Sequence, residues 1–429
     1  MSERSIRARI PQIELPEYVV RLLTVFEDNG FEAYVVGGAV RDLLRGAEYI
    51  NDYDVTTNAL PEETKRLFSG YMIYETGIKH GTVTVNVDGN MIEVTTFRTD
   101  GEYTDSRHPD KVTFTRNIIE DLARRDFTVN AMALSLDGRL VDPFDGIYDL
   151  SEGIIRAVGD PERRFTEDAL RIMRAYRFAA KLCYEIDDET LAATQKCAKG
   201  LKNISRERIG VEWEKLLTSP FCAKVLYYME EYGVLGVIFP KACIPVGFYR
   251  KIESLSPEYA LRCAAFFKDV RPEDIPTVAE RICLKNSDLE EIKAILMAVS
   301  ELRADKKLDV HLFAYRYGEC AHHAALIVFK ESLFDVHFPA HIRKALQLLP
   351  IHSRTDLCVS GGDLIDAKIP DRSLLSPIFS LIITKVVSEG LKNEKTAIIN
   401  ELPSILKEIE SDIKADPTSW RKMDKYRIK

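Results

Sequence analysis

The sequence has no uninterrupted apolar run that approaches the roughly 20 residues a membrane-spanning helix needs. Residues 1–16 are charged and lack the apolar core of a signal peptide. We therefore expect a cytoplasmic protein with no membrane contact. Hydrophobic residues make up 46% of the 429-residue chain and charged residues 29%, a balance that is typical of soluble proteins with several domains.

Cysteine pairs and histidine motifs of the metal-binding kind are also missing. The eight cysteines form no C-x-x-C pair, and the eight histidines form no H-E-x-x-H motif and no His-Asp pair. Zinc and a disulfide framework are therefore disfavoured, and we expect buried, reduced thiols. The net charge of −8 argues against non-specific coating of nucleic acid, although a local basic surface would be enough to bind RNA.

The first 140 residues mix helical and strand patterns. Their spacing predicts helices over 17–29, 39–45 and 61–68, and strands at 33–36 and from Tyr53 to Thr56. Two alternating segments, 82–87 and 91–97, are joined by Asp88-Gly89, which predicts a hairpin. From residue 166 to about 407 the apolar spacing is helical, and the basic segment 420–429 is expected to be a frayed tail. The sequence thus predicts a small α/β head followed by a long all-α body.

Paired carboxylates suggest a metal-dependent reaction. Asp52 and Asp54 are two residues apart, and on a strand such residues point to the same face. Two carboxylates there repel each other unless a cation lies between them, and hard oxygen ligands favour magnesium. Upstream, Gly37-Gly38 opens a helix that carries Arg41, an arrangement that brings backbone N–H groups and a guanidinium close to a phosphate.

A third carboxylate, Glu93, lies in the alternating segment 91–97. If this strand adjoins the one that carries Asp54, three carboxylates converge, as in two-metal phosphoryl transfer. One ion would then help to deprotonate an RNA 3′-hydroxyl, and the other would hold a triphosphate. The alternatives are a solvated turn for Asp52-Tyr53-Asp54 and a surface position for Glu93.

Two further motifs are E-D-L-A-R-R-D-F-T-V-N-A-M-A, residues 120–133, and E-D-A-L-R-I-M-R-A-Y-R-F, residues 167–178. With G-G-A-V-R-D and D-Y-D, they resemble the bacterial class II tRNA nucleotidyltransferases (CCA-adding enzymes) and their poly(A) polymerase relatives. The resemblance covers residues 15–220, and V-S-G-G-D-L-I-D, residues 359–366, resembles the start of the family's tail. It implies an α+β, polymerase-beta-like head (1–140, a mixed sheet with helices), then an all-α neck (141–205), body (206–350) and tRNA-binding tail (351–429).

The resemblance also assigns roles. It implies that Asp52, Asp54 and Glu93 bind Mg²⁺ and are catalytic, and that the nucleotide is bound by Gly38, Arg41, Arg125, Asp126, Asn130, Asp168, Arg171, Arg174 and Arg177. Within this set, Asp168 and Arg171 match the family's amino-acid template, with Arg174 and Arg177 beside them. The implied partners are the tRNA 3′ acceptor end, CTP and ATP. We expect no membrane and no protein partner, and a monomer or a homodimer.

The residues themselves support base recognition by Asp168 and Arg171. Thr166 is a plausible N-cap for a helix that begins at Glu167, and on that helix positions i and i+3 share one face. A carboxylate accepts from an exocyclic amine, and a guanidinium donates to ring acceptors. Cytosine and adenine present an amine beside a ring-nitrogen acceptor, whereas guanine and uracil present a carbonyl and an N–H. One Asp/Arg pair can thus accept C and A; the alternative is a surface ion pair.

Arg174 and Arg177 continue around the same helix in three-residue steps, so phosphate or RNA contact suits them better than one base edge. The segment S-R-E-R-I-G-V-E-W-E-K-L-L, residues 205–217, resembles the helix that supports the nucleotide-reading helix in the family. We expect its charges to support geometry rather than chemistry. A solvated helix face is the alternative.

The polar segment 98–112 bears on the product. Family members that add all of CCA keep such a loop, whereas those that add only CC have lost or shortened it. Arg98, Asp100, Glu102, Asp105 and Arg107 are all present, so we expect a switch from CTP to ATP and synthesis of the whole CCA. A narrower relative that adds CC, A or poly(A) stays open, and so does a catalytically dead RNA-binding module. The extended HD phosphohydrolase domain of some relatives is not expected.

Overall fold

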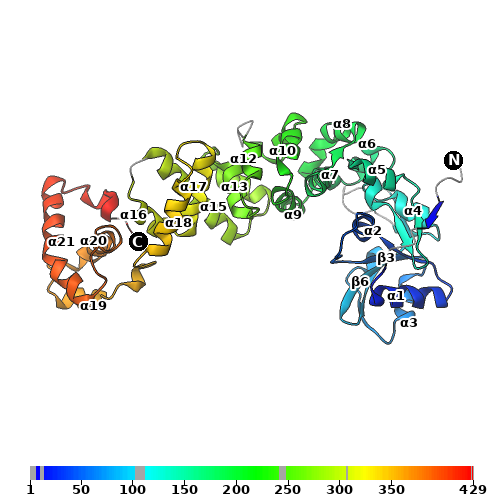
Figure 1. Cartoon of the computed structure of the whole chain (residues 1–429), viewed down its shortest axis with the longest axis horizontal. Helices are drawn as coiled ribbons and strands as arrows, with labels where there is room; N and C mark the ends of the chain where they lie inside the picture. Colours follow the sequence, from blue (N-terminus) through cyan, green and yellow to red (C-terminus); the bar gives the residue numbers. More distant parts are fainter. Residues whose placement is uncertain are drawn as a thin grey trace. The chain divides into compact units, whose positions relative to one another are not determined.

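The structure is a computed structural model that describes residues 6–9, 14–101, 112–240, 248–305, 308–426 and 428. It forms two compact units, Met1–Pro257 with Val270–Leu284, and Glu258–Asp269 with Lys285–Lys429 (Figure 1). None of the helices in these residues combines the length and the apolar character that a membrane span requires. The division into head, neck, body and tail at residues 140, 205 and 350 stays a prediction.

An eight-stranded sheet forms the centre of the head, in the order β1-β10-β9-β2-β3-β6-β5-β4. Its strands are β1 (Ile6–Arg9), β2 (Ala33–Val36), β3 (Asp54–Thr57), β4 (Met72–Tyr74), β5 (Thr82–Val87), β6 (Asn90–Thr96), β9 (Ala133–Ser135) and β10 (Arg139–Val141). The β3–β6 pair is parallel and the other neighbours are antiparallel, so the predicted mixed sheet is confirmed. Two small sheets pair β7 (Arg98–Asp100) with β8 (Val112–Phe114) and β11 (Ile154–Ile155) with β12 (Glu185–Ile186).

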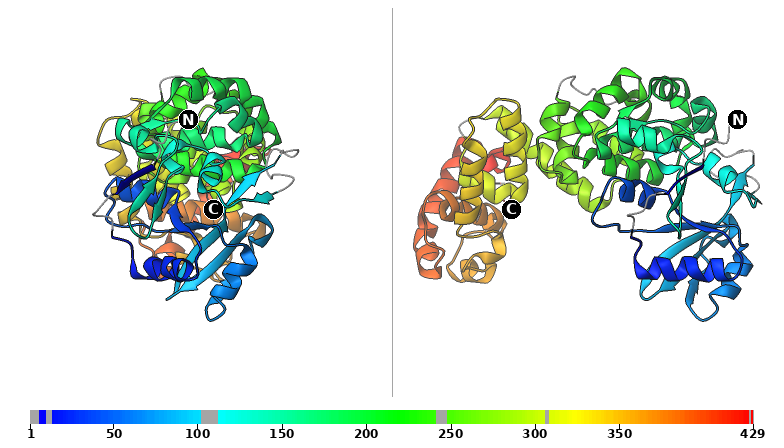
Figure 2. Two further views of the ribbon diagram at one scale, coloured as in Figure 1. Left: turned by 90° about the vertical axis from the view of Figure 1, so that its right-hand side faces the viewer. Right: turned by 45° about the vertical axis from the view of Figure 1, so that its right-hand side comes forward.

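The predicted hairpin is present as β5 and β6. Asp88 and Gly89 adopt φ of 52° and 85° at the turn, which is the conformation that Asp-Gly favours in two-residue hairpin loops. The alternating residues Val83, Val85 and Val87 are buried on the side of the sheet that faces helix α1 (Glu17–Asp28). Helix α1 lies along this face (Figure 2) and buries the apolar stripe predicted from its spacing.

The rest of the first unit is mainly helical. Its other helices are α2 (Gly38–Leu44), α3 (Pro61–Leu67), α4 (Ile118–Ala123), α5 (Gly146–Glu152), α6 (Pro161–Glu167), α7 (Leu170–Leu182), α8 (Asp188–Cys197), α9 (Arg206–Leu217), α10 (Cys222–Glu231), α11 (Val234–Ile238), α12 (Tyr249–Glu253) and α14 (Ile275–Arg281). Helices α7 and α9 pack against each other, and Trp213 of α9 is fully buried. A mixed head followed by a helical remainder is therefore the observed fold class.

The expected helix start at Glu167 with Thr166 as its N-cap is wrong. Both residues belong to α6, whose N-cap is Asp160, with Pro161 at the first helical position. Asp168 then takes an extended conformation (φ −144°, ψ 102°) that ends α6. Its carboxylate accepts from the Leu170 N–H at 3.0 Å, in the first turn of α7. Asp168 therefore lies in the break between two helices instead of within one.

The second unit is built from helices around its own core. They are α13 (Tyr259–Phe267), α15 (Asn286–Ala304), α16 (Val310–Tyr317), α17 (Glu319–Lys330), α18 (Phe338–Leu348), α19 (Gly361–Asp366), α20 (Leu375–Ser388) and α21 (Lys395–Ala415). The expectation of a frayed segment after residue 420 is wrong, because Trp420, Tyr426 and Ile428 are buried in this core. The Ser380 hydroxyl also donates to the Ile428 carbonyl at 2.9 Å.

The cysteines of the described residues are free thiols, as expected, but the expectation that they are buried is only partly right. Cys222 and Cys263 are buried, whereas Cys183, Cys283 and Cys358 are exposed. Cys183 ends α7 in a left-handed conformation with φ of 61°, a position at the helix end that faces solvent.

Candidate functional site

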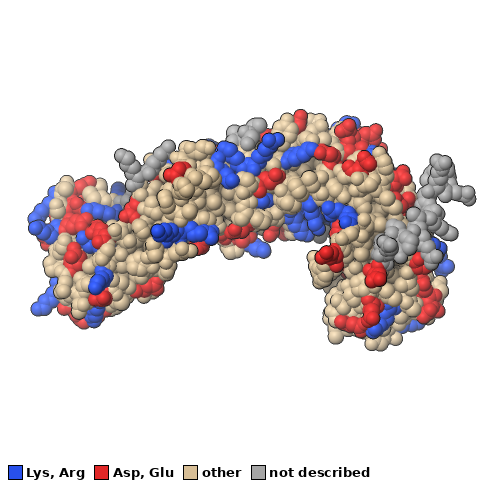
Figure 3. All heavy atoms as spheres, in the orientation of Figure 1, with Lys and Arg blue, Asp and Glu red and all other residues tan. Residues whose placement is uncertain are grey.

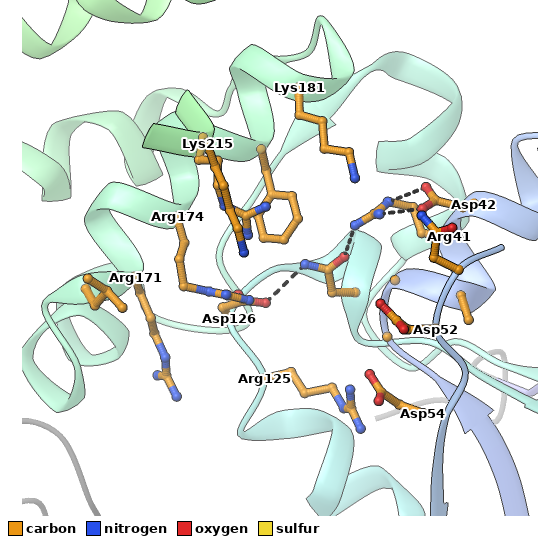
Figure 4. A pocket seen from close by; sticks show the side chains of 18 of the residues that line it. Arg41, Asp42, Asp52, Asp54, Arg125, Asp126, Arg171, Arg174, Lys181 and Lys215 are labelled. Carbon is orange, nitrogen blue, oxygen red and sulfur yellow. Dashed lines mark hydrogen bonds and ion pairs between the residues drawn. The ribbon is translucent and has the colours of Figure 1, made fainter. Parts of the chain in front are cut away.

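A cavity of about 820 Å³ opens in the first unit between the head and helices α7 and α9. This volume is in the range of small-molecule sites. Figure 3 shows lysine and arginine side chains gathered around a hollow in this unit, and Figure 4 shows the cavity from close by. Of the predicted site residues, its lining includes Gly38, Arg41, Asp52, Asp54, Arg125, Asp126, Asn130, Asp168, Arg171, Arg174 and Arg177.

Glu93 is outside this lining but beside it. It is the register partner of Asp54 in the parallel β3–β6 pair, so the two side chains share one face of the sheet. Asp52 precedes β3 and lines the cavity together with Asp54, while Tyr53 between them is buried in the head core. The three carboxylates therefore gather at one edge of the cavity. Asp54 is paired with Glu93 between the two strands, whereas Asp52 lies just before β3.

The electrostatics of Asp54 test whether a cation fits here. Burial, and then the negative charges of Glu93 and Asp52, raise the pKa of Asp54, against the opposing effect of Arg125. No three acidic, histidine or cysteine side chains of the described part stand close enough to form a finished metal site. The donors are nevertheless hard oxygens whose mutual repulsion a divalent cation would relieve, so the residues fit such a cation.

The Gly37-Gly38 turn brings the backbone close to these carboxylates. Gly37 has φ of 72°, and a Cβ at that position would lie 3.4 Å from Nη1 of Arg125 and 3.8 Å from Oδ2 of Asp54. Arg125 points toward Asp54 (Figure 4), and its guanidinium also contacts Asp121 at 3.3 Å. The turn thus leaves room for two side chains of opposite charge beside the backbone.

A continuous set of hydrogen bonds crosses the cavity wall. Arg41 forms an ion pair with Asp42 at 2.8 Å and donates to Oδ1 of Asn130 at 2.7 Å. The amide nitrogen of Asn130 donates to Asp126 at 3.2 Å, and Asp126 accepts from Arg174 at 2.6 and 2.7 Å. The resemblance implied that Arg41, Asp126, Asn130 and Arg174 all bind the nucleotide, and the structure brings these four residues together.

Asp126 is ionised within this network. Burial alone would raise its pKa, but the Arg174 and Arg171 guanidiniums and the Asn130 amide hold the pKa of Asp126 at about 2. Arg174 and Arg177 also form ion pairs with Glu212 of α9, a carboxylate that is only 6% exposed. The network therefore joins α2, the turn at residues 128–130, α7 and α9.

The two residues expected to recognise the base both line the cavity but do not pair with each other. Asp168 forms an ion pair with Arg208 of α9, with the shorter contact at 2.7 Å. Arg171 donates to Glu167 at 2.9 Å and to the Arg124 carbonyl at 2.9 Å. Each side chain is thus held by its own partner, which fixes both functional groups at the cavity edge.

Sequence reasoning missed several residues of this site. Residues that line the cavity without having been predicted include Asp42, Tyr49, Arg124, Phe178, Lys181, Arg208 and Lys215. Arg208 and Lys215 belong to the segment 205–217, whose charges were expected to support geometry. Arg208 and Glu212 form ion pairs with other residues of the site, as expected for charges that support its geometry. The alternative of a solvated helix face therefore does not describe them. The partner of Arg208 lies 40 residues away in the sequence and that of Glu212 lies 35 residues away, so no local pattern could reveal these pairs.

Phe178 links three of the guanidiniums. Its ring centroid lies 3.8 Å from the Arg177 guanidinium carbon, 5.2 Å from that of Arg174 and 5.3 Å from that of Arg41. These distances are within the range of cation–π attraction. Phe178 therefore holds positive groups together at the cavity wall.

The polar segment expected to govern the CTP-to-ATP switch is mostly outside the described residues, including Glu102, Asp105 and Arg107. Arg98 and Asp100 lie in strand β7, and the backbone N–H of Arg98 donates to Asp121 at 3.3 Å. The role of this segment in product choice stays a prediction.

Three family models match the chain. Residues 33–156 match the poly A polymerase head domain, residues 183–243 match the probable RNA and SrmB-binding site of polymerase A, and residues 264–402 match a putative tRNA nucleotidyltransferase domain 2. Together they span most of the sequence, in the order expected from the motifs.

Individual proteins give the same result. The chain is 54% identical over 392 residues to the CCA-adding enzyme of Leuconostoc mesenteroides, covering 88% of this chain and 93% of that one. It is 39% identical over 360 residues to the CCA-adding enzyme of Leuconostoc citreum, covering 80% and 85%. The crystal structure of the Bacillus stearothermophilus CCA-adding enzyme in complex with CTP superposes with a TM-score of 0.78 at 31% identity, covering 93% of this chain and 100% of that one.

Proposed function

Because this chain belongs to the family of CCA-adding tRNA nucleotidyltransferases, we propose that it adds and repairs the 3′-terminal CCA of tRNA. It uses CTP and ATP as substrates and no nucleic-acid template. The observation that carries the proposal is that one cavity is lined both by the carboxylates Asp52 and Asp54 and by the base-recognition residues Asp168 and Arg171. A nucleotide held there would have its base and its reacting phosphate bound within one compact unit.

Base selection follows from the donors and acceptors of the two side chains. The Asp168 carboxylate accepts from the exocyclic amine of cytosine or adenine, and the Arg171 guanidinium donates to the adjacent ring nitrogen. Guanine or uracil would leave both groups mispaired, at a cost of about 1–3 kcal/mol for each group. The contacts of Asp168 with Arg208 and of Arg171 with Glu167 support this role, because they keep the two groups oriented before a base arrives.

Nucleotidyl transfer joins the tRNA 3′-oxygen to the α-phosphorus. The bond from the α-phosphorus to the β-phosphate oxygen breaks, pyrophosphate leaves with that electron pair, and the proton of the 3′-hydroxyl passes to water. Asp52, Asp54 and Glu93 would hold magnesium. When bound, magnesium supplies Lewis-acid activation of the hydroxyl and neutralises charge on the departing pyrophosphate, with two ions as the proposed arrangement. Arg41 and Arg125, which line the same cavity, orient the phosphates.

The tRNA is held by its shape and by its phosphates more than by its sequence. The match of residues 183–243 to an RNA-binding family model supports contact through the helices after the head. A cytoplasmic location stays a prediction.

The test uses three tRNA substrates, ending at the discriminator base, at C and at CC. Each is incubated with the full chain, magnesium, and CTP, ATP or both, and the products are sized on a sequencing gel. We expect full CCA on the shortest substrate when both nucleotides are present. We expect CTP alone to stop at CC, and ATP alone to extend only the substrate that ends in CC.

The other outcomes select the narrower relatives. An enzyme that stops after CC with both nucleotides present is a CC-adding enzyme, and one that extends only the CC substrate is an A-adding enzyme. Long homopolymer tails from ATP alone identify a poly(A) polymerase. Absence of any product in all reactions would leave an RNA-binding module without catalysis and overturn the proposal.

A further inference from the structure

Two exposed lysines that line the cavity have no ion-pair partner among the described residues. Lys181 belongs to the last turn of α7 and Lys215 to α9, and both line the cavity. Their ammonium groups reach into it from these helices (Figure 4). Neither ammonium group forms a hydrogen bond or an ion pair with another described residue, and Lys215 accepts only through its backbone carbonyl, from the Ser219 hydroxyl. Each of the arginines that line the cavity, in contrast, forms at least one ion pair.

The surroundings of these lysines are strongly positive. The cavity lining contains nine lysines and arginines against five aspartates, a formal excess of four positive charges. Burial lowers the pKa of Lys181, and the neighbouring positive charges of Arg41, Arg177 and Lys215 lower it further, with only Asp42 opposing them. Asp42 already accepts two hydrogen bonds from Arg41, so it does not neutralise the lysines. A cluster of this kind attracts a compact polyanion.

The position of the cluster identifies which anion fits. Lys181 lies beside Arg41, on a different side of the cavity from Arg171 (Figure 4). Arg41 in turn is hydrogen-bonded to Asn130 and through it to Asp126. A nucleotide with its base at Arg171 and its α-phosphate at Asp52 and Asp54 has its remaining phosphates left to place. Lys181 and Lys215 are the cations of the wall without an ion-pair partner in the part of the chain that the structure describes.

Resting on the function proposed above, we propose that Lys181 and Lys215 bind the β- and γ-phosphates of the incoming nucleoside triphosphate. Lysine suits this task because its ammonium is a compact charge with three rotatable donors, able to follow oxygen atoms of a flexible triphosphate. A phosphodiester of RNA carries one charge per residue and would leave most of the excess unbalanced. The lysines therefore distinguish a triphosphate from a monophosphate, independently of the base.

The test measures nucleotide binding without tRNA, so that no transfer occurs. Isothermal titration calorimetry compares CTP, CDP and CMP on the full chain with magnesium, for wild type, Lys181→Met, Lys215→Met and the double variant. We expect each single variant to bind CTP about tenfold more weakly, as for loss of a hydrogen bond between charged groups, and to bind CMP as wild type does. Lys181→Arg should retain most of the CTP affinity.

The matched control is Lys199→Met, which removes an exposed lysine of the same unit outside the cavity. It should leave CTP affinity unchanged, and melting temperatures will show that every variant is folded. The inference alone would be overturned if a variant lost the same affinity for CTP and for CMP. It would also be overturned if the CTP affinity were unchanged while tRNA binding became weaker, because the lysines would then bind another part of the substrate. Wild-type protein that binds no CTP or ATP would overturn the proposed function and this inference with it.

Discussion

The carboxylate of Asp168 accepts hydrogen bonds from both terminal nitrogens of Arg208, at 2.7 and 3.3 Å. Asp168 lies in the break between α6 and α7, where its carboxylate also accepts from the Leu170 N–H, and Arg208 reaches it from α9. The orientation of a proposed base-recognition group therefore depends on a residue that belongs to another helix. Arg208 is a positioning residue in this arrangement.

We expect Arg208→Gln to reduce nucleotide selectivity, because the Asp168 carboxylate loses the partner that orients it. The ratio of kcat/KM for CTP to that for UTP should fall by about tenfold, the equivalent of one hydrogen bond to a charged group. Arg208→Lys should restore part of it. Arg206→Gln is the control, since Arg206 pairs with the exposed Glu280 outside the cavity. An unchanged selectivity in Arg208→Gln would contradict the positioning role.

Loss of an acidic residue at the sheet edge should have a different effect. We expect Asp52→Ala to abolish addition of both C and A, by at least about 10³-fold, because several kcal/mol of metal-dependent stabilisation are lost. Asp168→Ala should mainly weaken or relax nucleotide choice. Single-turnover rates with all four nucleotides separate these effects, and equal loss of selectivity from both changes would contradict the division of roles.

The contact between α9 and α14 predicts a stability effect at Gly210. A Cβ at this position would lie 2.1 Å from the carbonyl oxygen of Ile282. We expect Gly210→Ala to lower the free energy of unfolding by about 1–3 kcal/mol, because the backbone at Ile282, directly after α14, must move away from α9. Thermal denaturation measures it. Gly236→Ala in α11 is the control, since its Cβ would meet open space, and this change should be neutral or stabilising by up to about 1 kcal/mol.

Acid should weaken the network around Asp126. Its pKa of about 2 in the folded protein is below the value of about 3.9 in an unfolded chain. The ionised carboxylate therefore contributes stability above about pH 4, and this contribution is lost as the pH falls toward 2. We expect the melting temperature of Asp126→Asn to be well below that of the wild type at pH 7. This difference in melting temperature should become smaller between pH 4 and pH 3. A difference in melting temperature that stays constant across this range would contradict a stabilising role of the ionised Asp126 carboxylate.

The C-terminal segment, residues 420–429, should contribute to the stability of the second unit. Trp420 and Tyr426 pack edge-to-face with ring centroids 5.2 Å apart, and both are buried. We expect deletion of residues 420–429 to lower the melting temperature of the full chain markedly, because the core of α20 and α21 would be opened to water. A frayed tail would leave the melting temperature unchanged, so differential scanning calorimetry distinguishes the two descriptions.

Local patterns predicted the elements of the head well. The β5–β6 hairpin follows from strict alternation and an Asp-Gly turn, and α1 follows from one apolar stripe that ends before Gly30. These signals are confined to a few neighbouring residues, so tertiary contacts did not overturn them. The position of Asp54 beside Glu93 required the additional assumption that their two strands adjoin, which the parallel β3–β6 pair bears out.

The break at Asp168 could not be found in the same way. Thr166 is a reasonable N-cap residue, and the apolar spacing after it is helical, so the sequence predicts one helix that begins at Glu167. What ends α6 is the extended conformation of Asp168 together with its side-chain contact to the Leu170 N–H. Its ion pair with Arg208 joins residues 40 positions apart. A single sequence contains no signal for such long-range pairs.

The hydrogen-bonded set that runs from Asp42 through Arg41, Asn130 and Asp126 to Arg174 has an evolutionary consequence. Each member forms an ion pair or a hydrogen bond with the next. Replacing one member therefore leaves its neighbour with an unpaired charge or an unsatisfied hydrogen-bonding group away from water. Changes along it will combine non-additively. Descendants of this gene can therefore explore new residues here only by substituting neighbours in concert, which makes this strip of the protein slow to diverge.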